Sequence, residues 1–184
     1  MYTCIRKGYT VCLFFASRES NTLRLTQFSN FAIRVLMYSA LKGTIPSAVP
    51  EIAKAYGASH NHIKKVAAEL CQLGYLHTVQ GRAGGVRLMR RPEDIRIGEV
   101  IRHTERGVVF VECFDLKSNT CPLEPACQLK RALEESLRAF FDVLDRYTLA
   151  DLIRSPDQLS PLLAIGQTTA GVTNSHGKQS PAIA

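Results

Sequence analysis

The 184-residue sequence lacks the motifs that mark common enzymes and membrane proteins. It has no Gly-x-Ser-x-Gly nucleophile motif, no phosphate-binding Gly-Lys-Ser/Thr loop and no recognisable pair of catalytic carboxylates. No apolar run approaches the roughly 18–20 residues that a membrane-spanning helix needs. The apolar run Val11 to Ala16 follows Arg6 and Lys7, but it is shorter than the apolar region of a usual signal peptide. We therefore expect a protein that is not an enzyme, enters no membrane and stays in the cytoplasm.

Close pairs of cysteines are also absent. Three of the six cysteines form a cluster, Cys113, Cys121 and Cys127, with seven and then five residues between them. Zinc sites usually contain cysteine pairs about two to four residues apart, so the wider gaps here leave zinc as a minor alternative. An odd cluster cannot pair off completely as disulfides, which favours a reducing compartment and the ligation of a metal or a cluster.

Positive charge is in excess. The formal net charge is +7 and the isoelectric point is about 9.3, which favours a polyanionic partner such as nucleic acid. A basic, solvated surface with no partner would give the same charge. Composition alone does not separate these two interpretations.

The hydrophobic pattern of the first half predicts three helices. Apolar residues recur at three- and four-residue steps over residues 25–43, which is typical of an amphipathic helix. Shorter helices are predicted at residues 49–56 and 60–73, with Gly57 in the tight turn between them. Because the second of this pair is strongly amphipathic, the two predict a helix-turn-helix.

A β-hairpin is predicted directly after the helix-turn-helix. Residues 75–80 and 86–90 are strand-like, and the glycine-rich segment 81–85 lies between them. A hairpin in this place is a wing. The predicted fold is therefore mostly α, with a winged helix-turn-helix domain over residues 23–105.

The candidate DNA-binding residues lie at the start of the second helix of the pair and on the wing. The first turn of a recognition helix faces the major groove, where Asn reads adenine, Ser and His donate hydrogen bonds and Lys neutralises phosphate. An arginine at the tip of a wing suits the minor groove. An amphipathic helix with a merely wet polar face is the alternative, and the basic hairpin weighs against it. The candidates are Ser59, His60, Asn61, His62, Lys64, Lys65, Arg82 and Arg87.

The cysteine-containing segment, residues 106–128, is polar and rich in turns, which does not suit three inert buried cysteines. Thiolates bind soft metals and iron–sulfur clusters. A [4Fe–4S] cluster needs four ligands and the segment supplies three, so such a cluster would be open to small molecules, as a sensor requires. A [2Fe–2S] cluster is possible, and a regulator that uses zinc or thiols without iron is the competing class.

A long helix is predicted after the cysteines. Apolar residues from Ala126 to Leu144 alternate steps of three and four, close to the seam of a coiled coil, and favour a two-fold homodimer interface over residues 129–155. Packing of this helix against its own domain is the alternative. Residues 156–184 are rich in Ser, Thr, Gly, Pro and Ala with few charges, and we expect them to be disordered.

Several of these segments together resemble one family. Residues 24–34, 51–53, 61–62, 78–88 and 97–100, with the cysteine triplet, look like the bacterial winged-helix iron–sulfur transcription regulators. The resemblance covers about residues 24–153, and a Gly-Arg-x-Gly-Gly wing followed by the triplet is a specific combination. It implies a homodimer that binds a roughly palindromic double-stranded operator and an iron–sulfur cluster ligated by the three cysteines.

Within the family, the Ser-x-Asn-His start of the recognition helix and residues 145–152 resemble the nitric-oxide-sensitive repressors. An iron-responsive regulator of the same family is the second interpretation of the sequence. One branch uses a histidine ligand at the position that Lys130 occupies here, so that mode of ligation is not expected. Some nitric-oxide-sensitive members take a fourth ligand from an aspartate of the other subunit. The matching position holds Asn30, a neutral and weaker ligand, which leaves the fourth ligand open.

The first 22 residues have no clear helical or strand period. Family members usually begin with Met directly before Arg-Leu-Thr, and here Leu23 precedes that sequence. We expect Leu23 to be the initiator, read from an alternative start codon. N-terminal sequencing of protein made from the native gene checks this, and a mature chain that starts at Met1 would refute it.

Overall fold

The computed structural model describes residues 24–107, 110–115 and 119–166. The extension 1–22, the expected start at Leu23 and residues 167–184 lie outside the described residues. The three helices and the hairpin predicted from the sequence are present, with ends that differ by only a few residues. The regular elements are α1 (Gln27–Lys42), α2 (Val49–Ala55), α3 (His60–Gln72), β1 (Leu76–Val79), β2 (Gly85–Leu88), α4 (Ile97–Thr104), α5 (Gln128–Leu144), α6 (Leu149–Leu152) and α7 (Pro156–Leu162).

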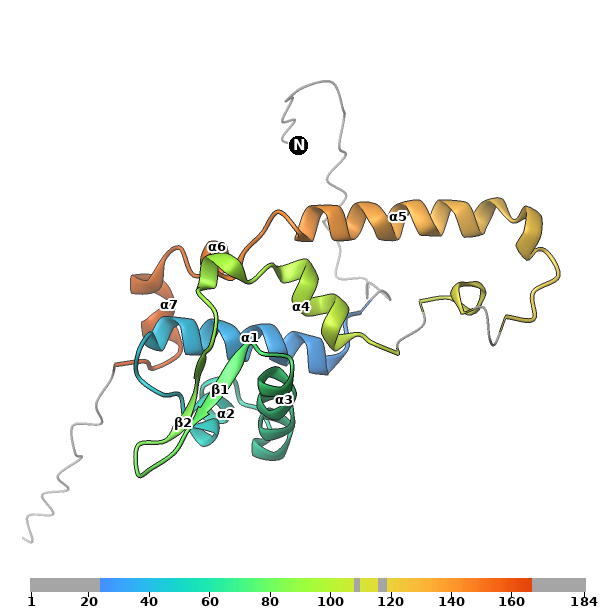
Figure 1. Cartoon of the computed structure of the whole chain (residues 1–184). Helices are drawn as coiled ribbons and strands as arrows, with labels where there is room; N and C mark the ends of the chain where they lie inside the picture. The colour runs from blue at the N-terminus through green and yellow to red at the C-terminus, as the bar shows by residue number, and fades with distance from the viewer. Residues whose placement is uncertain (1–23, 108–109, 116–118, 167–184) are drawn as a thin grey trace, which may run out of the picture.

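Helix α1 is the centre of the winged-helix domain. It lies between α4 and α6 on one side and α2, α3 and the hairpin on the other (Figure 1). Its apolar stripe is fully buried at Ala32, Val35 and Leu36, and α3 contributes Ile63 and Val66 to the same core. The periodicity that predicts these helices therefore marks the faces that pack together.

The wing is held against the loop that precedes α2. Its strands pair antiparallel, from Leu76 opposite Leu88 to Val79 opposite Gly85. Ser47 exchanges two backbone hydrogen bonds with Val86, of 2.8 and 2.9 Å. A Cβ at Gly85 would collide with the Ser47 carbonyl, so this close approach requires glycine. The wing and the helix-turn-helix consequently form one unit.

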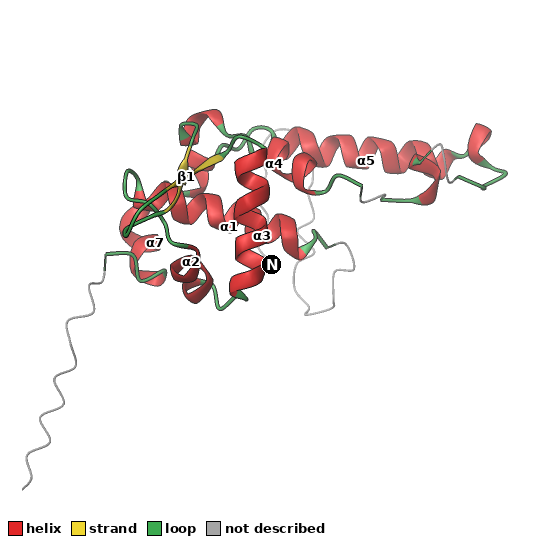
Figure 2. Ribbon diagram, turned by 60° about the horizontal axis from the view of Figure 1, so that its bottom comes forward, coloured by secondary structure: helices red, strands yellow, loops and turns green. Residues whose placement is uncertain are grey.

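Helix α5 projects from this unit as an arm (Figures 1 and 2). None of its 17 residues is buried. At its C-terminal end the chain returns to the domain, where Leu149 N donates to Ile95 O at 2.8 Å and Ile97 N donates to Tyr147 O at 3.0 Å. The arm is thus anchored to the domain near its C-terminal end, and the cysteine segment leads into its N-terminal end.

The expected disorder of residues 156–184 is wrong for its first part. Residues 156–162 form α7, and the following Leu163 and Ile165 pack against the core of the domain. The low charge of this segment suggested disorder, but its few apolar residues find a partner surface that composition does not reveal. The long helix begins at Gln128, one residue before the predicted region 129–155, because Cys127 is its N-cap.

Candidate functional site

The first turn of α3 presents a polar face to solvent. Ser59, His60 and Asn61 are exposed there, and Lys64 and Lys65 follow on the same helix. Ile63 and Val66 anchor the helix in the core from the opposite face. Five of the predicted DNA-contacting residues therefore share one accessible surface.

His62 differs from its neighbours. It is half-buried, and its ring meets the ring of Phe31 edge-on at a centroid distance of 5.0 Å. Arg34 lies over the same Phe31 ring and over the ring of Tyr56, at 5.5 Å from each centroid. His62 therefore helps to fix α3 against α1, in addition to the base contact predicted for it.

On the wing, the two predicted arginines have different surroundings. Arg82 is exposed at the tip and makes no ion pair within the described part of the chain. Arg87 is half-buried opposite His77, and its buried Nε has no hydrogen-bond partner among the described residues. Arg82 is thus the freer cation, and Arg87 carries a donor that still needs an acceptor.

The three clustered cysteines come from one loop and the start of one helix. Cys113 lies in a 3-10 turn at Glu112–Phe114, Cys121 lies eight positions later and Cys127 caps α5. All three are free thiols and are half-buried. Lys130 N donates to Cys127 Sγ at 3.4 Å, and the N-terminal end of a helix favours an anionic atom at such a place.

Hydrogen bonds close the loop between the first two cysteines. The Glu112 carboxylate accepts from the Thr120 amide at 3.0 Å and from its hydroxyl at 2.8 Å. These bonds from Thr120 hold the pKa of Glu112 below its usual range. The carboxylate is therefore ionised at neutral pH, and its oxygen accepts both hydrogen bonds. The Asn119 side chain also accepts from the Cys121 amide at 3.0 Å.

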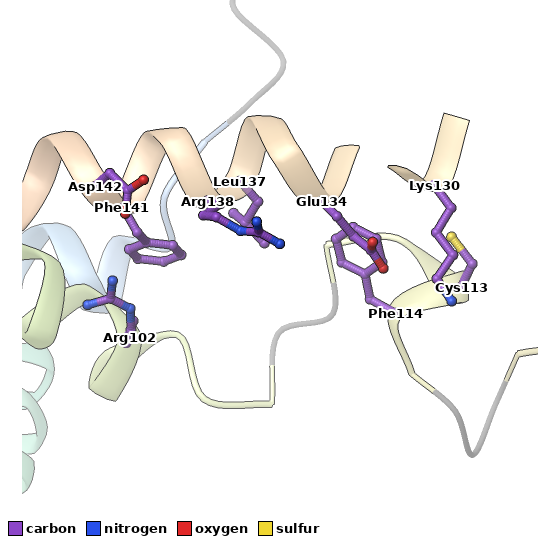
Figure 3. Close-up of a pocket in the computed structure, with 9 residues that line it drawn as sticks. All are labelled: Arg102, Cys113, Phe114, Lys130, Glu134, Leu137, Arg138, Phe141 and Asp142. Atoms are coloured by element: carbon purple, nitrogen blue, oxygen red, sulfur yellow. The ribbon is translucent and has the colours of Figure 1, made fainter. Parts of the chain in front are cut away.

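A cavity of about 520 Å³ lies between this loop and α5 (Figure 3). Cys113 and Lys130 face each other at one end, and Arg102 of α4 lies at the other end. An ion pair with Glu124 raises the pKa of Lys130, which keeps a positive charge beside the thiol. The lining residues are Arg102, Cys113, Phe114, Lys130, Glu134, Leu137, Arg138, Phe141 and Asp142.

Cys127 lines a different hollow, of about 360 Å³, with Pro122 and Pro125. Within the described ranges, no group of three or more His, Cys, Asp or Glu side chains converges as a metal site. The structure therefore brings the thiols onto one segment and does not gather them. Asn30 is exposed on the first turn of α1. The donor set nevertheless fits an iron–sulfur cluster in kind, because the three thiols are free and accessible and none is used in a disulfide.

Sequence reasoning missed Arg102 and Asp145, which join α4 to the end of α5. The Arg102 guanidinium forms two hydrogen bonds to the Asp145 carboxylate, at 2.6 and 2.8 Å. Asp145 begins the segment 145–152 that resembles the family, but 43 positions separate it from Arg102, so no local pattern predicts that the two side chains pair.

The fold and the exposed basic surface define a winged-helix transcriptional regulator, and comparison with known proteins gives the family. The model of the Rrf2 family, described as iron-dependent transcriptional regulators, matches residues 25–155. This chain belongs to the Rrf2 family, which confirms the resemblance seen in the sequence. No described helix is long and apolar enough to cross a membrane.

Curated relatives match over nearly their whole length. The chain is 44% identical over 147 residues to the HTH-type transcriptional regulator NsrR of Shouchella clausii, which covers 79% of this chain and 99% of that protein. It is 45% identical over 143 residues to NsrR of Bacillus subtilis (77% and 97%) and 42% identical over 143 residues to protein aau3 of Rhizobium meliloti (78% and 93%). The chain is therefore an NsrR-like transcriptional regulator and not an enzyme.

Solved structures confirm the mostly α winged-helix fold. The structure of CymR, the global cysteine regulator of B. subtilis, has a TM-score of 0.59 at 26% identity and covers 72% of this chain and 97% of CymR. T. potens IscR has a TM-score of 0.60 at 24% identity and covers 82% of this chain and 95% of that chain.

The exposed position of Arg82 generates a prediction. Arg82→Ala should weaken binding to a duplex selected from a random-sequence pool by the wild-type chain. It should also lower the slope of log affinity against log salt by about one, because one cation leaves the interface. Fluorescence anisotropy at several salt concentrations measures both effects. Arg154→Ala removes an exposed arginine that pairs with Asp151 away from the wing, and it is the matched control. An unchanged affinity and slope in Arg82→Ala would remove the wing from the interface.

Proposed function

We propose that this protein is a DNA-binding repressor whose binding to its operator is controlled by an iron–sulfur cluster. Nitric oxide causes the protein to dissociate from the operator. The observation that carries the proposal is the set of three free thiols in the segment that leads into the N-terminal end of α5, a helix with no buried residue. The chain that contains them is 44% identical to an NsrR. Operator DNA and nitric oxide are the partners.

The winged-helix domain of residues 24–105, which we call the reading head, contacts DNA through two surfaces. Ser59, His60 and Asn61 meet base edges and phosphates in the major groove, and Lys64 and Lys65 neutralise phosphates. Arg82 enters the minor groove beside them, and Arg87 supports it. Because the wing is bonded to the loop before α2, both surfaces approach the duplex together.

Cys113, Cys121 and Cys127 would hold the cluster through thiolate sulfurs. A bound cluster supplies iron that reacts with nitric oxide, and an incomplete set of protein ligands leaves that iron accessible. Lys130 places a positive charge beside Cys113, where it would offset part of the negative charge of that thiolate. The fourth ligand is open, and Asn30 stands at the matching position of the family.

The homodimer would form along the outer apolar face of α5. Leu129 and Val143 are 67% and 46% exposed, and with Leu133 they follow one stripe of the helix. Leu137, Phe140 and Phe141 line a cavity together with residues of α4. Leu129 and Val143 on the outer stripe stay exposed in the described part of the chain, and a second copy related by a two-fold axis would cover them.

Control of DNA binding requires two states of this dimer. In one state the cysteine loop and α5 hold the two reading heads at the spacing of the operator half-sites. In the other the loop relaxes and the spacing changes. Near-complete switching needs a difference in DNA affinity of about 5.5 kcal/mol, which a few lost base or phosphate contacts supply.

An iron-responsive regulator is the second candidate, because the family model is described as iron-dependent. In that case iron chelation releases DNA and nitric oxide does not act directly. A regulator that uses zinc or thiols without iron is the third. Metal analysis of protein purified without oxygen separates it from the other two.

The cysteine assignment predicts that Cys121→Ala loses the visible absorbance and the iron of anaerobically purified protein. Wild-type protein should release the selected duplex when nitric oxide is titrated. Cys71→Ala is the matched control, because Cys71 lies on α3, outside the loop, and should leave the iron content unchanged. Iron and sulfide analysis with absorbance spectra measures the outcome. Full cluster content in Cys121→Ala would count against the assignment.

The dimer assignment predicts that Val143→Glu shifts the protein from twice its 20.4 kDa chain mass toward the mass of one chain. A carboxylate within an apolar seam, here near the C-terminal end of α5, loses water without gaining a partner, which opposes association. Arg131→Glu adds the same group, with a larger change of charge, on the polar face of α5 and should leave the dimer intact. Sedimentation equilibrium measures both variants. Two dimeric variants would show that the interface lies elsewhere.

A further inference from the structure

We infer that the Arg102–Asp145 pair is the joint through which the cysteine segment sets the orientation of the reading head. This inference rests on the proposed function and names two positioning residues for it. Neither residue touches DNA or a cluster in this account. They act by fixing the angle between α5 and α4.

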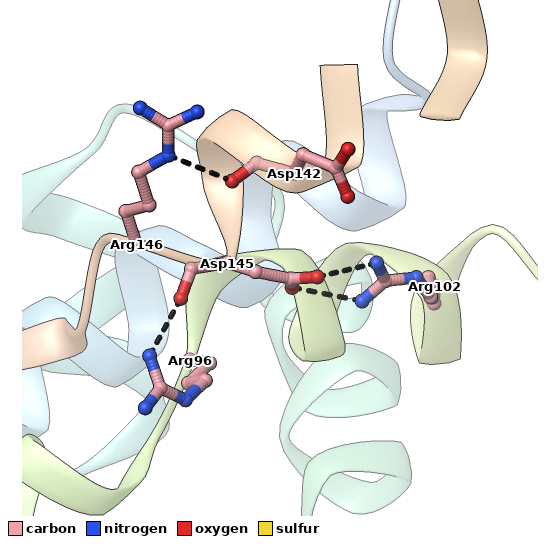
Figure 4. A network of polar contacts seen from close by, with 5 residues as sticks. All are labelled: Arg96, Arg102, Asp142, Asp145 and Arg146. Carbon is pink, nitrogen blue, oxygen red and sulfur yellow. Dashed lines mark hydrogen bonds and ion pairs between the residues drawn. The ribbon is translucent and has the colours of Figure 1, made fainter. Parts of the chain in front are cut away.

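The joint is built from three polar contacts to one residue (Figure 4). The Asp145 carboxylate accepts two hydrogen bonds from Arg102, and the Asp145 carbonyl accepts one from Arg96 Nη1 at 2.6 Å. Two parallel bonds between a guanidinium and a carboxylate fix direction as well as distance. Asp145, the residue that directly follows α5, is therefore held by two arginines from the segment that contains α4.

Packing makes the joint tighter than the ion pair alone. A Cβ at Gly98 would collide with the Asp145 side chain, so α4 approaches this residue as closely as a backbone can. The Arg102 guanidinium also lies over the ring of Phe141, 4.4 Å from its centroid. A single isolated surface pair contributes little, but a pair with bidentate geometry, ring stacking and a glycine contact holds one arrangement.

Arg102 also borders the cysteine segment. It lines the cavity that contains Cys113 and Phe114 (Figure 3). It lines a second cavity, of about 430 Å³, that contains Phe110. Arg102 and the segment therefore border the same two cavities, so a change in how the segment packs on α5 changes the shape of the space beside this guanidinium.

On its other side, α4 is bonded to the start of α1 and to the residue that precedes the wing. Thr104 Oγ1 donates to Ser29 Oγ at 2.8 Å, and the Glu105 carboxylate accepts from Thr26 N at 2.9 Å, at the start of α1. The Tyr75 hydroxyl, just before the wing, is 2.8 Å from His103 Nδ1. The Arg102–Asp145 pair thus lies between α5 and a helix that is fixed to both α1 and the wing.

The pair persists over the pH range in which the protein would work. The hydrogen bonds from Arg102 hold the pKa of Asp145 below its usual range. The contribution of a depressed carboxyl is present above its unfolded pKa of about 3.9 and is lost as pH falls through the folded value. The joint therefore stays closed at neutral pH and responds to the cysteine segment rather than to protons.

The test uses the full chain, with and without its cluster, and the duplex selected by cluster-loaded wild-type protein. The measured quantity is the ratio of the dissociation constants in the cluster-free and cluster-loaded states. Wild-type protein should give a ratio of about 10⁴, the fold-change that near-complete switching requires. Asp145→Asn keeps the shape of the side chain and removes its charge and the paired bonds, and it should bring the ratio close to one while the iron content stays normal.

A second readout follows the joint itself. Hydrogen exchange of the α4 amides should slow on cluster loading in the wild type and should not change in Asp145→Asn. Asp94→Asn is the matched control, because it breaks another doubly bonded Arg–Asp pair, with Arg91, that does not join α4 to α5. It should keep the wild-type ratio.

The outcomes separate the two levels of the argument. A wild-type ratio of one overturns the proposed function and the joint with it. A wild-type ratio in the expected range with an equal ratio in Asp145→Asn overturns the joint alone. If Asp145→Asn fails to fold, Arg102→Lys keeps the charge and loses the paired geometry. A full wild-type ratio in that variant equally overturns the joint.

Discussion

Helix α5 leaves part of its apolar surface exposed in the described part of the chain, and the arrangement of the molecule depends on this constraint. The inner face of the helix lines cavities with α4 and the cysteine segment, whereas Leu129 on the outer stripe is 67% exposed. Each square ångström of such surface costs about 25 cal/mol while it faces water. The arm is therefore stable where a second surface covers it, which couples its position to association.

The reading head is rigid by comparison. Its core contains α1 and α3 side chains with no exposed surface, and the Ser47–Val86 bridge locks the wing to the same body. The head therefore moves as one piece if it moves at all. In the proposed dimer, motion that changes the spacing of the two heads would occur where α5 meets α4, because that junction rests on polar contacts and a few partly buried side chains.

Local patterns predicted the parts of the fold that local interactions determine. The apolar stripe of α1, the turn at Gly57 and the glycine-rich wing each follow from neighbouring residues, and the structure confirms them. Long-range contacts escaped prediction. The packing of Leu163 and Ile165 depends on a surface formed by distant elements, and Arg102 finds Asp145 across 43 positions. The cysteine spacing indicates the kind of ligand, but it does not specify that Cys113 and Cys127 line separate hollows.

That separation has a physical consequence for a sensor. A signal shifts an equilibrium only by its differential affinity for the two states. If the thiols of the segment already met at one point, the segment would change its conformation only slightly on binding a cluster. A segment held by a few hydrogen bonds, such as Glu112 to Thr120, has low local stability and can adopt a second arrangement at small cost. Arg102 lines the cavity that contains Cys113 and also holds the anchored end of α5. A rearrangement of the segment that reshapes this cavity therefore alters the surroundings of the residue that joins α5 to α4.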